Sequence, residues 1–167
     1  FLDDRFLKRM AEEYDFEDIP DQVDEVFANM VLQRVDIIAP SLVLAQAANE
    51  SGWGSSRFAR HGNNLFGMHT NDGSGMVPKR RKRGHTFTVA VYPTPRASIE
   101  AYVHNLNTQN SYRQLRRVRA SLRSRNATIS GYALANGLMS YSERGSAYIS
   151  ELQSMIGSNN LSQYDTE

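Results

Sequence analysis

The sequence of 167 residues contains no cysteine. This absence excludes disulfide bonds, thiolate nucleophiles and cysteine-bound metal sites, and it makes the fold indifferent to an oxidising compartment. No apolar run approaches the ~20 residues that a membrane-spanning helix requires. The 40% of hydrophobic and 22% of charged residues are typical of a globular protein. A chain of this length suits one domain with a sizeable core.

Acidic residues are scarce in the middle of the chain. Between Asp36 and Tyr141 the acids are Glu50, Asp72 and Glu100, and none occurs from residue 73 to residue 99. Residues 1–30 instead carry ten acids against three bases, and the remainder carries sixteen bases against eight acids, a net charge of +8. A cationic body of this kind favours a polyanionic partner.

The four histidines are not spaced as metal ligands. None forms a His-x-x-x-His pair or the Glu-flanked helix of a zinc enzyme, and cysteine cannot complete such a site. The histidines are His61, His69, His85 and His104. We therefore expect neither a metal nor another cofactor.

The most informative stretch is LAQAANESGWGSSRFARHGNNLFG, at residues 44–67. Pro40 and Ser41 predict the start of a helix, with Ser41 as its cap, and the Ala-rich run carries that helix to Glu50. Gly52 and Gly54 then allow the backbone to turn. Beside an apolar wall the charged form of Glu50 is disfavoured, so its pKa should rise towards the range of a general acid.

A purely structural interpretation competes with this one. In it Glu50 merely ends a helix and Trp53 belongs to the core, which for an isolated Glu would be the better explanation. Here Trp53 lies between two glycines, and two asparagines precede Phe66. Aromatic faces and amides are the groups that bind the apolar side and the polar substituents of a sugar ring. The combination favours a carbohydrate site.

The same stretch resembles the glucosaminidase domain of bacterial peptidoglycan hydrolases, glycoside hydrolase family 73. The hallmark A-x-A-x-x-E-S-G-W-G, followed by N-N-L-F-G, occurs at residues 45–54 and 63–67. The flanking sequence is more similar to the Bax-like branch of Gram-negative bacteria. The matching segments are RVD at 34–36, PSLVL at 40–44, HNLNT at 104–108 and YSERG at 141–145. The resemblance covers about residues 30–156.

This resemblance implies an α+β, mainly α fold, in which a lysozyme-like helical lobe has one small β-hairpin flanking the cleft. It makes Glu50 the catalytic proton donor. It also places Tyr141 in the cleft, although YSER at 141–144 departs from the family's commoner Y-A-T-D-P, and a packing role for this tyrosine stays open. The side chains then expected to contact substrate are Ser51, Trp53, Asn64, Phe66, Arg83 and His85.

The chain divides into three parts by sequence. Residues 1–36 predict one or two amphipathic helices, broken near Ile19–Pro20, that pack on the body. Residues 37–156 form the glucosaminidase-like catalytic domain, and residues 157–167 form a polar, frayed tail.

Within the catalytic domain the patterns predict a hairpin and four further helices. The hairpin has strands near residues 75–78 and 85–92, and Thr94 and Pro95 then begin a helix to residue 107. A helix at residues 111–125 turns Leu115, Val118 and Leu122 inward and Arg116, Arg119 and Arg123 outward. The last two helices cover residues 132–139 and 146–156.

The run KRRKR at residues 79–83 is the most basic segment. It is explained by a solvated hairpin tip, by nucleic-acid binding or, given the resemblance, by a grip on anionic glycan or stem peptide. No helix-turn-helix, zinc-finger or aromatic RNA-binding pattern accompanies it. We expect peptidoglycan glycan strands as the partner and no nucleic acid.

A second catalytic carboxylate is not evident. Most glycosidases use two, yet the hairpin segment has none, where many family members carry a Glu. Three mechanisms stay open. The substrate acetamide could act as nucleophile, with Tyr141 steadying the positive intermediate; Asp72, Glu100 or Glu143 could activate water; or Glu50 alone could form an anhydro product. We favour the first.

The sequence thus predicts a peptidoglycan hydrolase that cleaves β-1,4 glycosidic bonds, as an endo-β-N-acetylglucosaminidase. The alternatives are a non-catalytic murein-binding module, and lytic transglycosylase or muramidase chemistry at the same Glu. We expect a monomer in the periplasm or cell envelope. Because the chain begins with Phe1, an export signal or membrane anchor would lie outside it.

Overall fold

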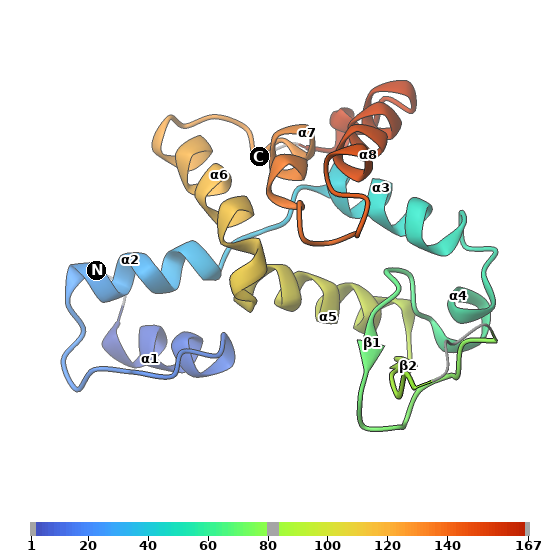
Figure 1. Cartoon of the computed structure of the whole chain (residues 1–167). Coiled ribbons are helices and arrows are strands. Elements are labelled where there is room, and N and C mark those ends of the chain that lie inside the picture. Colours follow the sequence, from blue (N-terminus) through green and yellow to red (C-terminus); the bar gives the residue numbers. More distant parts are fainter. Residues whose placement is uncertain (1–2, 80–83, 166–167) are drawn as a thin grey trace.

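The computed structural model describes residues 3–79 and 84–165, and helices dominate it (Figure 1). The α-helices are α1 (Asp4–Glu13), α2 (Glu25–Arg34), α3 (Pro40–Ser51), α4 (Arg57–Gly62), α5 (Pro95–Thr108), α6 (Arg113–Ser124), α7 (Gly131–Leu134) and α8 (Ser146–Ser158). Short 3-10 turns are η1 (Asn110–Tyr112), η2 (Ala135–Gly137) and η3 (Leu161–Tyr164). A small antiparallel pair, β1 (His69–Thr70) and β2 (Thr88–Val89), completes the described elements. This confirms the predicted α+β, mainly α class.

The main core surrounds α3. Leu42 and Ala45 of α3 are fully buried, as are Leu106 of α5 and Leu152 of α8. Gly131 lets α7 approach α3 closely, because a Cβ there would lie 2.1 Å from Ser41 Oγ. The helix that carries Glu50 is therefore held from several sides, which fixes the position of its end.

The start of α3 differs from the prediction. Pro40 occupies the first helical turn and Ala39 is the N-cap, without a capping side chain. Ser41 lies inside the helix and donates from its backbone N–H and its Oγ to the carboxylate of Asp165, at 2.9 and 2.6 Å. The expected cap role of Ser41 was wrong because an acid distant in sequence supplies the acceptor.

The C-terminal segment is also more ordered than predicted. Helix α8 continues to Ser158, and η3 leads to Asp165, which is buried and accepts a third hydrogen bond from the Gly131 N–H at 2.9 Å. The expectation of a frayed tail is thus wrong for residues 157–165. This segment fastens α3 to α7.

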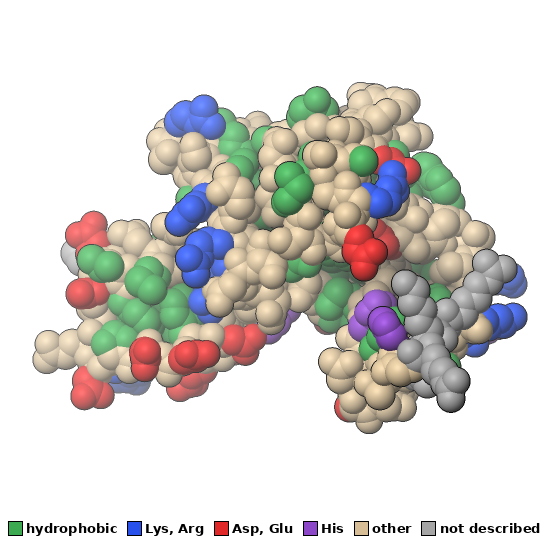
Figure 2. Space-filling model, in the orientation of Figure 1, with side chains coloured by type: hydrophobic (Ala, Val, Ile, Leu, Met, Phe, Trp, Pro, Cys, Tyr) green, Lys and Arg blue, Asp and Glu red, His purple; other side chains and the backbone are tan. Residues whose placement is uncertain are grey.

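Helices α1 and α2 share a small apolar cluster of their own, and the chain between them is not helical from residue 14 to residue 24. Within this lobe Arg34 donates to the Tyr14 carbonyl at 2.8 Å. The lobe contacts the body through His104 Nε2 of α5, which lies 2.8 Å from the Glu13 carbonyl. Acidic side chains gather on this lobe, while arginine and lysine appear on the adjoining body (Figure 2). None of the described helices is long and apolar enough to cross a bilayer.

Two arginines of α6 correct the predicted helix face. Arg119 is 1% exposed and Arg116 6% exposed, so neither projects outward as expected, whereas Arg123 is half exposed beside Asp36. Both buried arginines donate mostly to carbonyl oxygens at helix ends and in the segment between α2 and α3, where the helices supply no partner. The acceptors are the carbonyls of Gln33, Asp36 and Ile37 and Asn107 Oδ1 for Arg119, and those of Leu106 and Gln109 for Arg116.

The hairpin is present, but its first strand is not the predicted one at residues 75–78. Residues 88–89 lie inside the predicted second strand, but they pair with His69 and Thr70 in the register His69↔Val89 and Thr70↔Thr88. Of the predicted first strand, Met76 makes one isolated bridge to Val89. Helix α5 then begins as predicted, with Pro95 in its first turn and Thr94 Oγ1 accepting from the Ala97 N–H.

Candidate active site

Glu50 lies in the last turn of α3, which ends at Gly52 in the left-handed conformation (φ +57°). Its Oε1 accepts a hydrogen bond of 2.8 Å from the Tyr148 hydroxyl of α8. Its Oε2 faces the turn at Gly67, where a Cβ would come to 3.5 Å from it. Gly67 has φ +68° and no side chain, so nothing beyond the backbone of this turn residue stands against that oxygen.

Burial is the main reason why the pKa of Glu50 is raised from its usual 4.5. The hydrogen bond from Tyr148 opposes this effect, the negative charge of Glu151 reinforces it, and the Arg144 guanidinium opposes it. The raised pKa that the sequence predicted is confirmed, and its predicted cause, desolvation, is the largest one. A proton is therefore held on Glu50 to higher pH than on an exposed Glu.

Aromatic side chains from distant segments surround this carboxyl. The rings of Tyr141 and Tyr148 are parallel with centroids 5.7 Å apart, and Phe66 stacks on Tyr102 at 3.9 Å. The Tyr141 hydroxyl donates to the Phe66 carbonyl at 3.0 Å. Burial, reinforced by the charge of Glu50, raises the pKa of both Tyr141 and Tyr148, so both stay protonated at neutral pH.

Three of the predicted substrate contacts have internal partners instead. Ser51 Oγ donates to the Ala47 carbonyl and accepts from the Gly54 N–H, and Phe66 is 2% exposed. Asn64 is 1% exposed. Its amide donates to the carbonyls of Met68 and Ala90 at 2.8 Å, and its Oδ1 accepts from the Met68 N–H. These side chains hold the turn and the hairpin in place rather than presenting a surface to sugar, because the buried turn needs their hydrogen bonds and volume.

Trp53 is the exposed aromatic of the motif. Its side chain is 71% exposed, and its backbone is held at φ +56° between Gly52 and Gly54. A large aromatic face left open beside the end of α3 suits contact with the apolar side of a sugar ring. The prediction for Trp53 stays a prediction, and its exposure is compatible with it.

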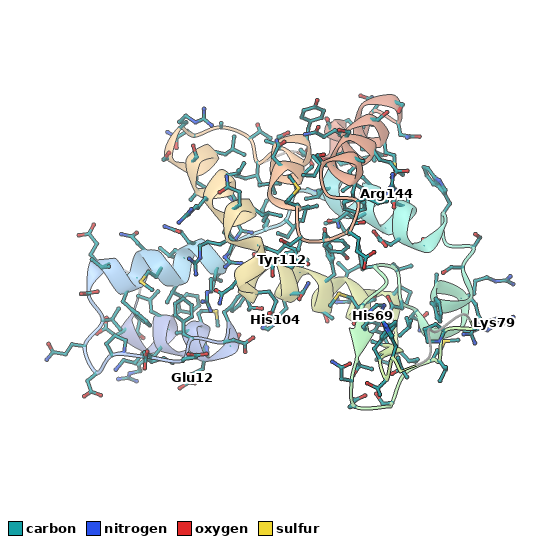
Figure 3. The ribbon with its side chains drawn as sticks, viewed as in Figure 1. Glu12, His69, Lys79, His104, Tyr112 and Arg144 are labelled. Carbon is teal, nitrogen blue, oxygen red and sulfur yellow. The ribbon has the colours of Figure 1, made fainter. Side chains whose placement is uncertain are left out.

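The hairpin carries a second aromatic group. His69 stacks on Phe87 at 4.3 Å and His85 meets the edge of the same ring at 5.6 Å. Figure 3 shows His69 at the side of the hairpin that adjoins the body. Burial lowers the pKa of His69, so this ring is neutral at pH 7. Sequence reasoning named His85 and missed Phe87; Arg83 lies outside the described residues.

The three acids that the sequence offered as a second carboxylate are all exposed, and two of them have local partners. Asp72 is exposed and accepts from the Ser74 N–H and hydroxyl, which lower its pKa, while exposed Glu100 pairs with Arg96 at 2.8 Å. Glu143 is exposed in the turn before α8. Among the described residues, no group of three or more His, Asp or Glu side chains could hold a metal ion.

Two residues of α8 near Glu50 escaped the sequence prediction. Tyr148 donates to Glu50, and Glu151, one turn later, raises the pKa of Glu50 and pairs with Arg144 at 2.6 Å. Their three-residue spacing on a predicted helix was the available signal, because it places both on one face.

Comparisons with known proteins agree with this arrangement. The family model described as "Mannosyl-glycoprotein endo-beta-N-acetylglucosaminidase", named Glucosaminidase, matches residues 26–161. Protein Bax of Escherichia coli (strain K12) is 39% identical over 131 residues, which are 78% of this chain and 46% of that protein, so the chain spans less than half of this relative's length. The crystal structure of the catalytic domain of the autolysin Auto from Listeria monocytogenes has a TM-score of 0.54 and 22% identity. That match covers 96% of this chain and 82% of that one, and it supports the fold. The chain therefore belongs to the glucosaminidase family.

Proposed function

We propose that this protein is a peptidoglycan hydrolase that cleaves β-1,4 glycosidic bonds of the glycan strand as an endo-β-N-acetylglucosaminidase, with Glu50 as general acid. One observation carries the proposal most directly. The half-buried Glu50 at the hallmark helix end has a raised pKa, one oxygen bound by Tyr148 and the other beside the bare Gly67 turn. Membership of the glucosaminidase family supports the class of reaction.

In the first step the Glu50 proton passes to the glycosidic oxygen as its bond to the sugar breaks. The acetamide oxygen of the N-acetylglucosamine attacks the anomeric carbon and forms a positively charged ring. The Tyr141 hydroxyl donates a hydrogen bond to the Phe66 carbonyl, so its lone pairs remain available to steady that charge. The Glu50 carboxylate then takes a proton from the water that opens the ring.

The local partners of Asp72 and Glu100 support the acetamide as nucleophile. Asp72 is engaged in its own turn and Glu100 in an ion pair on α5. Trp53 and the His69–Phe87–His85 group would bind the glycan on either side of the bond. The cationic body would attract the lactyl and peptide carboxylates of murein. The proposed site of action is the periplasm or cell envelope, and the proposed form is a monomer.

A non-catalytic murein-binding module is the second candidate, because the segment from residue 73 to residue 99 has no acid. The variant Glu50→Gln separates the two. Its amide oxygen can still accept from Tyr148, but it has no proton to donate. We expect turnover of purified murein to fall by roughly 10² to 10⁴, while cosedimentation with murein is retained. Equal turnover in both proteins would refute the role of Glu50.

A further inference from the structure

A buried chain of hydrogen bonds leads to Glu50 from three helices. The Tyr102 hydroxyl of α5 donates to Gln46 Oε1 of α3 at 2.5 Å, and Gln46 Nε2 donates to the Tyr148 hydroxyl of α8 at 2.9 Å. The Tyr148 hydroxyl donates to Glu50 Oε1 at 2.8 Å. Gln46 and Tyr102 are fully buried, so water does not compete for these groups.

The direction of this chain is fixed. Among the described residues, Gln46 Oε1 is the acceptor that the Tyr102 hydroxyl reaches, and burial raises the pKa of Tyr102 far enough to keep its proton. With its oxygen occupied, the Gln46 amide presents N–H to Tyr148. A hydroxyl has a single proton, so the proton of Tyr148 points to Glu50.

This direction determines where neutral Glu50 carries its own proton. Because Oε1 accepts the hydrogen bond from Tyr148, the proton resides on Oε2. That oxygen faces Gly67, which has no side chain. Without Gln46 the Tyr148 hydroxyl could turn round and accept a hydrogen bond from a proton on Oε1, which would direct the acidic hydrogen into the protein.

We propose that Gln46 is a positioning residue that, through Tyr148, holds the proton of Glu50 on Oε2, where it can reach the glycosidic oxygen. The proposal rests on the proposed function of Glu50 as the acid. It adds a residue that is itself too deeply buried to contact substrate. Tyr102 serves the same purpose one step further away, because its proton fixes the orientation of the Gln46 amide.

The groups that face Glu50 come from several elements. They are Tyr148 and Glu151 of α8, Arg144 and Tyr141 of the segment before it, and the turn at Gly67. Gln46→Met removes both hydrogen-bonding atoms at similar side-chain length and leaves all these groups in place. A change in the titration of Glu50 in this variant therefore reports on the hydrogen-bond chain.

The test follows the Glu50 carboxyl by ¹³C NMR titration in the whole chain, together with kcat and KM on murein at one pH. In Gln46→Met the neutral carboxyl gains Tyr148 as an acceptor, so we expect the Glu50 pKa to rise by about half a unit to one unit. We expect kcat to fall about tenfold with KM within about twofold of wild type. Tyr112→Phe, which removes another hydroxyl from the same core, should leave the titration and kcat unchanged.

A double-variant cycle makes the test specific. Tyr148→Phe removes the donor to the carboxylate, so it should also raise the Glu50 pKa, and adding Gln46→Met to it should change nothing further. Three results would each overturn the proposal. The Glu50 pKa could stay unchanged in folded Gln46→Met, or Gln46→Met could raise this pKa equally in the Tyr148→Phe background. The pKa could also shift while kcat stays unchanged. If Gln46→Met does not fold, Tyr102→Phe, which frees the amide to turn, should give the same shift and the same loss of kcat. The expected shifts with no cleavage by any protein would support the hydrogen-bond chain and refute the proposed function.

Discussion

At the scale of single residues, Glu50 shows how its surroundings hold a proton on a carboxyl group. Glu50 lies at the C-terminal end of α3, where the partial negative charge of the helix end disfavours a carboxylate in addition to burial. Tyr148 offsets part of this effect. The residue is thus poorly placed for stability at neutral pH and well placed to donate a proton.

A stability measurement tests this balance. The raised pKa means that the folded state holds the Glu50 proton more tightly than the unfolded state, so stability is lost as pH rises from about 4.5 through the raised value. Glu50→Gln is neutral throughout. We expect its melting temperature to exceed that of wild type at pH 8 and the difference to vanish near pH 4. A variant that melts below wild type at pH 8 would contradict this account.

Trp53 and Asn64 should separate substrate contact from positioning. Asn64→Ala removes three hydrogen bonds from a buried turn, so we expect a loss of roughly 2 to 4 kcal/mol in the free energy of unfolding. Trp53→Ala removes an exposed ring, so stability should change by less than about 0.5 kcal/mol.

Urea unfolding and murein cosedimentation distinguish the two variants. Trp53→Ala should weaken murein binding while its unfolding midpoint is retained. A lowered unfolding midpoint with unchanged murein binding would show that Trp53 supports the fold and does not contact substrate.

At the scale of elements, α3 depends on the end of the chain. The carboxylate of Asp165 holds the first turn of α3 and the start of α7 through three hydrogen bonds. It also places a negative charge near the N-terminus of α3, which the helix dipole favours. Glu50 is at the other end of the same helix, so the C-terminal segment helps to determine where the acid lies.

We therefore expect Asp165→Ala to lower the free energy of unfolding by roughly 2 to 4 kcal/mol, because three buried donors lose a charged acceptor. Asp72→Ala is the matched control, since this exposed acid bonds only within its own loop. Chemical denaturation of the three proteins gives the comparison. If both variants lost equally little free energy of unfolding, the C-terminal segment would have no structural role.

At the scale of the whole molecule, local patterns predicted the elements and missed the long-range contacts. Local signals predicted helix boundaries: the Ala-rich run predicted the end of α3, and Thr94 with Pro95 predicted the start of α5. The motif identified Glu50. The burial of Arg119 was missed because its acceptors lie in a segment some 80 residues earlier. The acceptor for Ser41 lies 124 residues later, and one acceptor for Asn64, the Ala90 carbonyl, lies 26 residues later.

The same limit applied to the site. Glu50 was singled out from its helix end as well as from the resemblance, and Tyr141 through the resemblance. Tyr148 and Gln46 had no signal apart from helical spacing, because they act only through contacts between α3 and α8. Burial of an aromatic next to a hallmark glutamate is decided by packing. The sequence motif placed Phe66 near Glu50, but it could not show whether the ring faces the core or the solvent.

The central claim is that this fold cleaves glycan bonds through the proton of Glu50. The measurement that tests it most directly is mass spectrometry of soluble murein fragments after borohydride reduction, with wild type and Glu50→Gln compared. The account predicts reduced N-acetylglucosaminitol ends in the wild-type digest and their loss in the variant. Reduced muramitol or anhydro ends would keep the role of Glu50 and change the bond or the product. No Glu50-dependent fragments from folded protein would contradict the account.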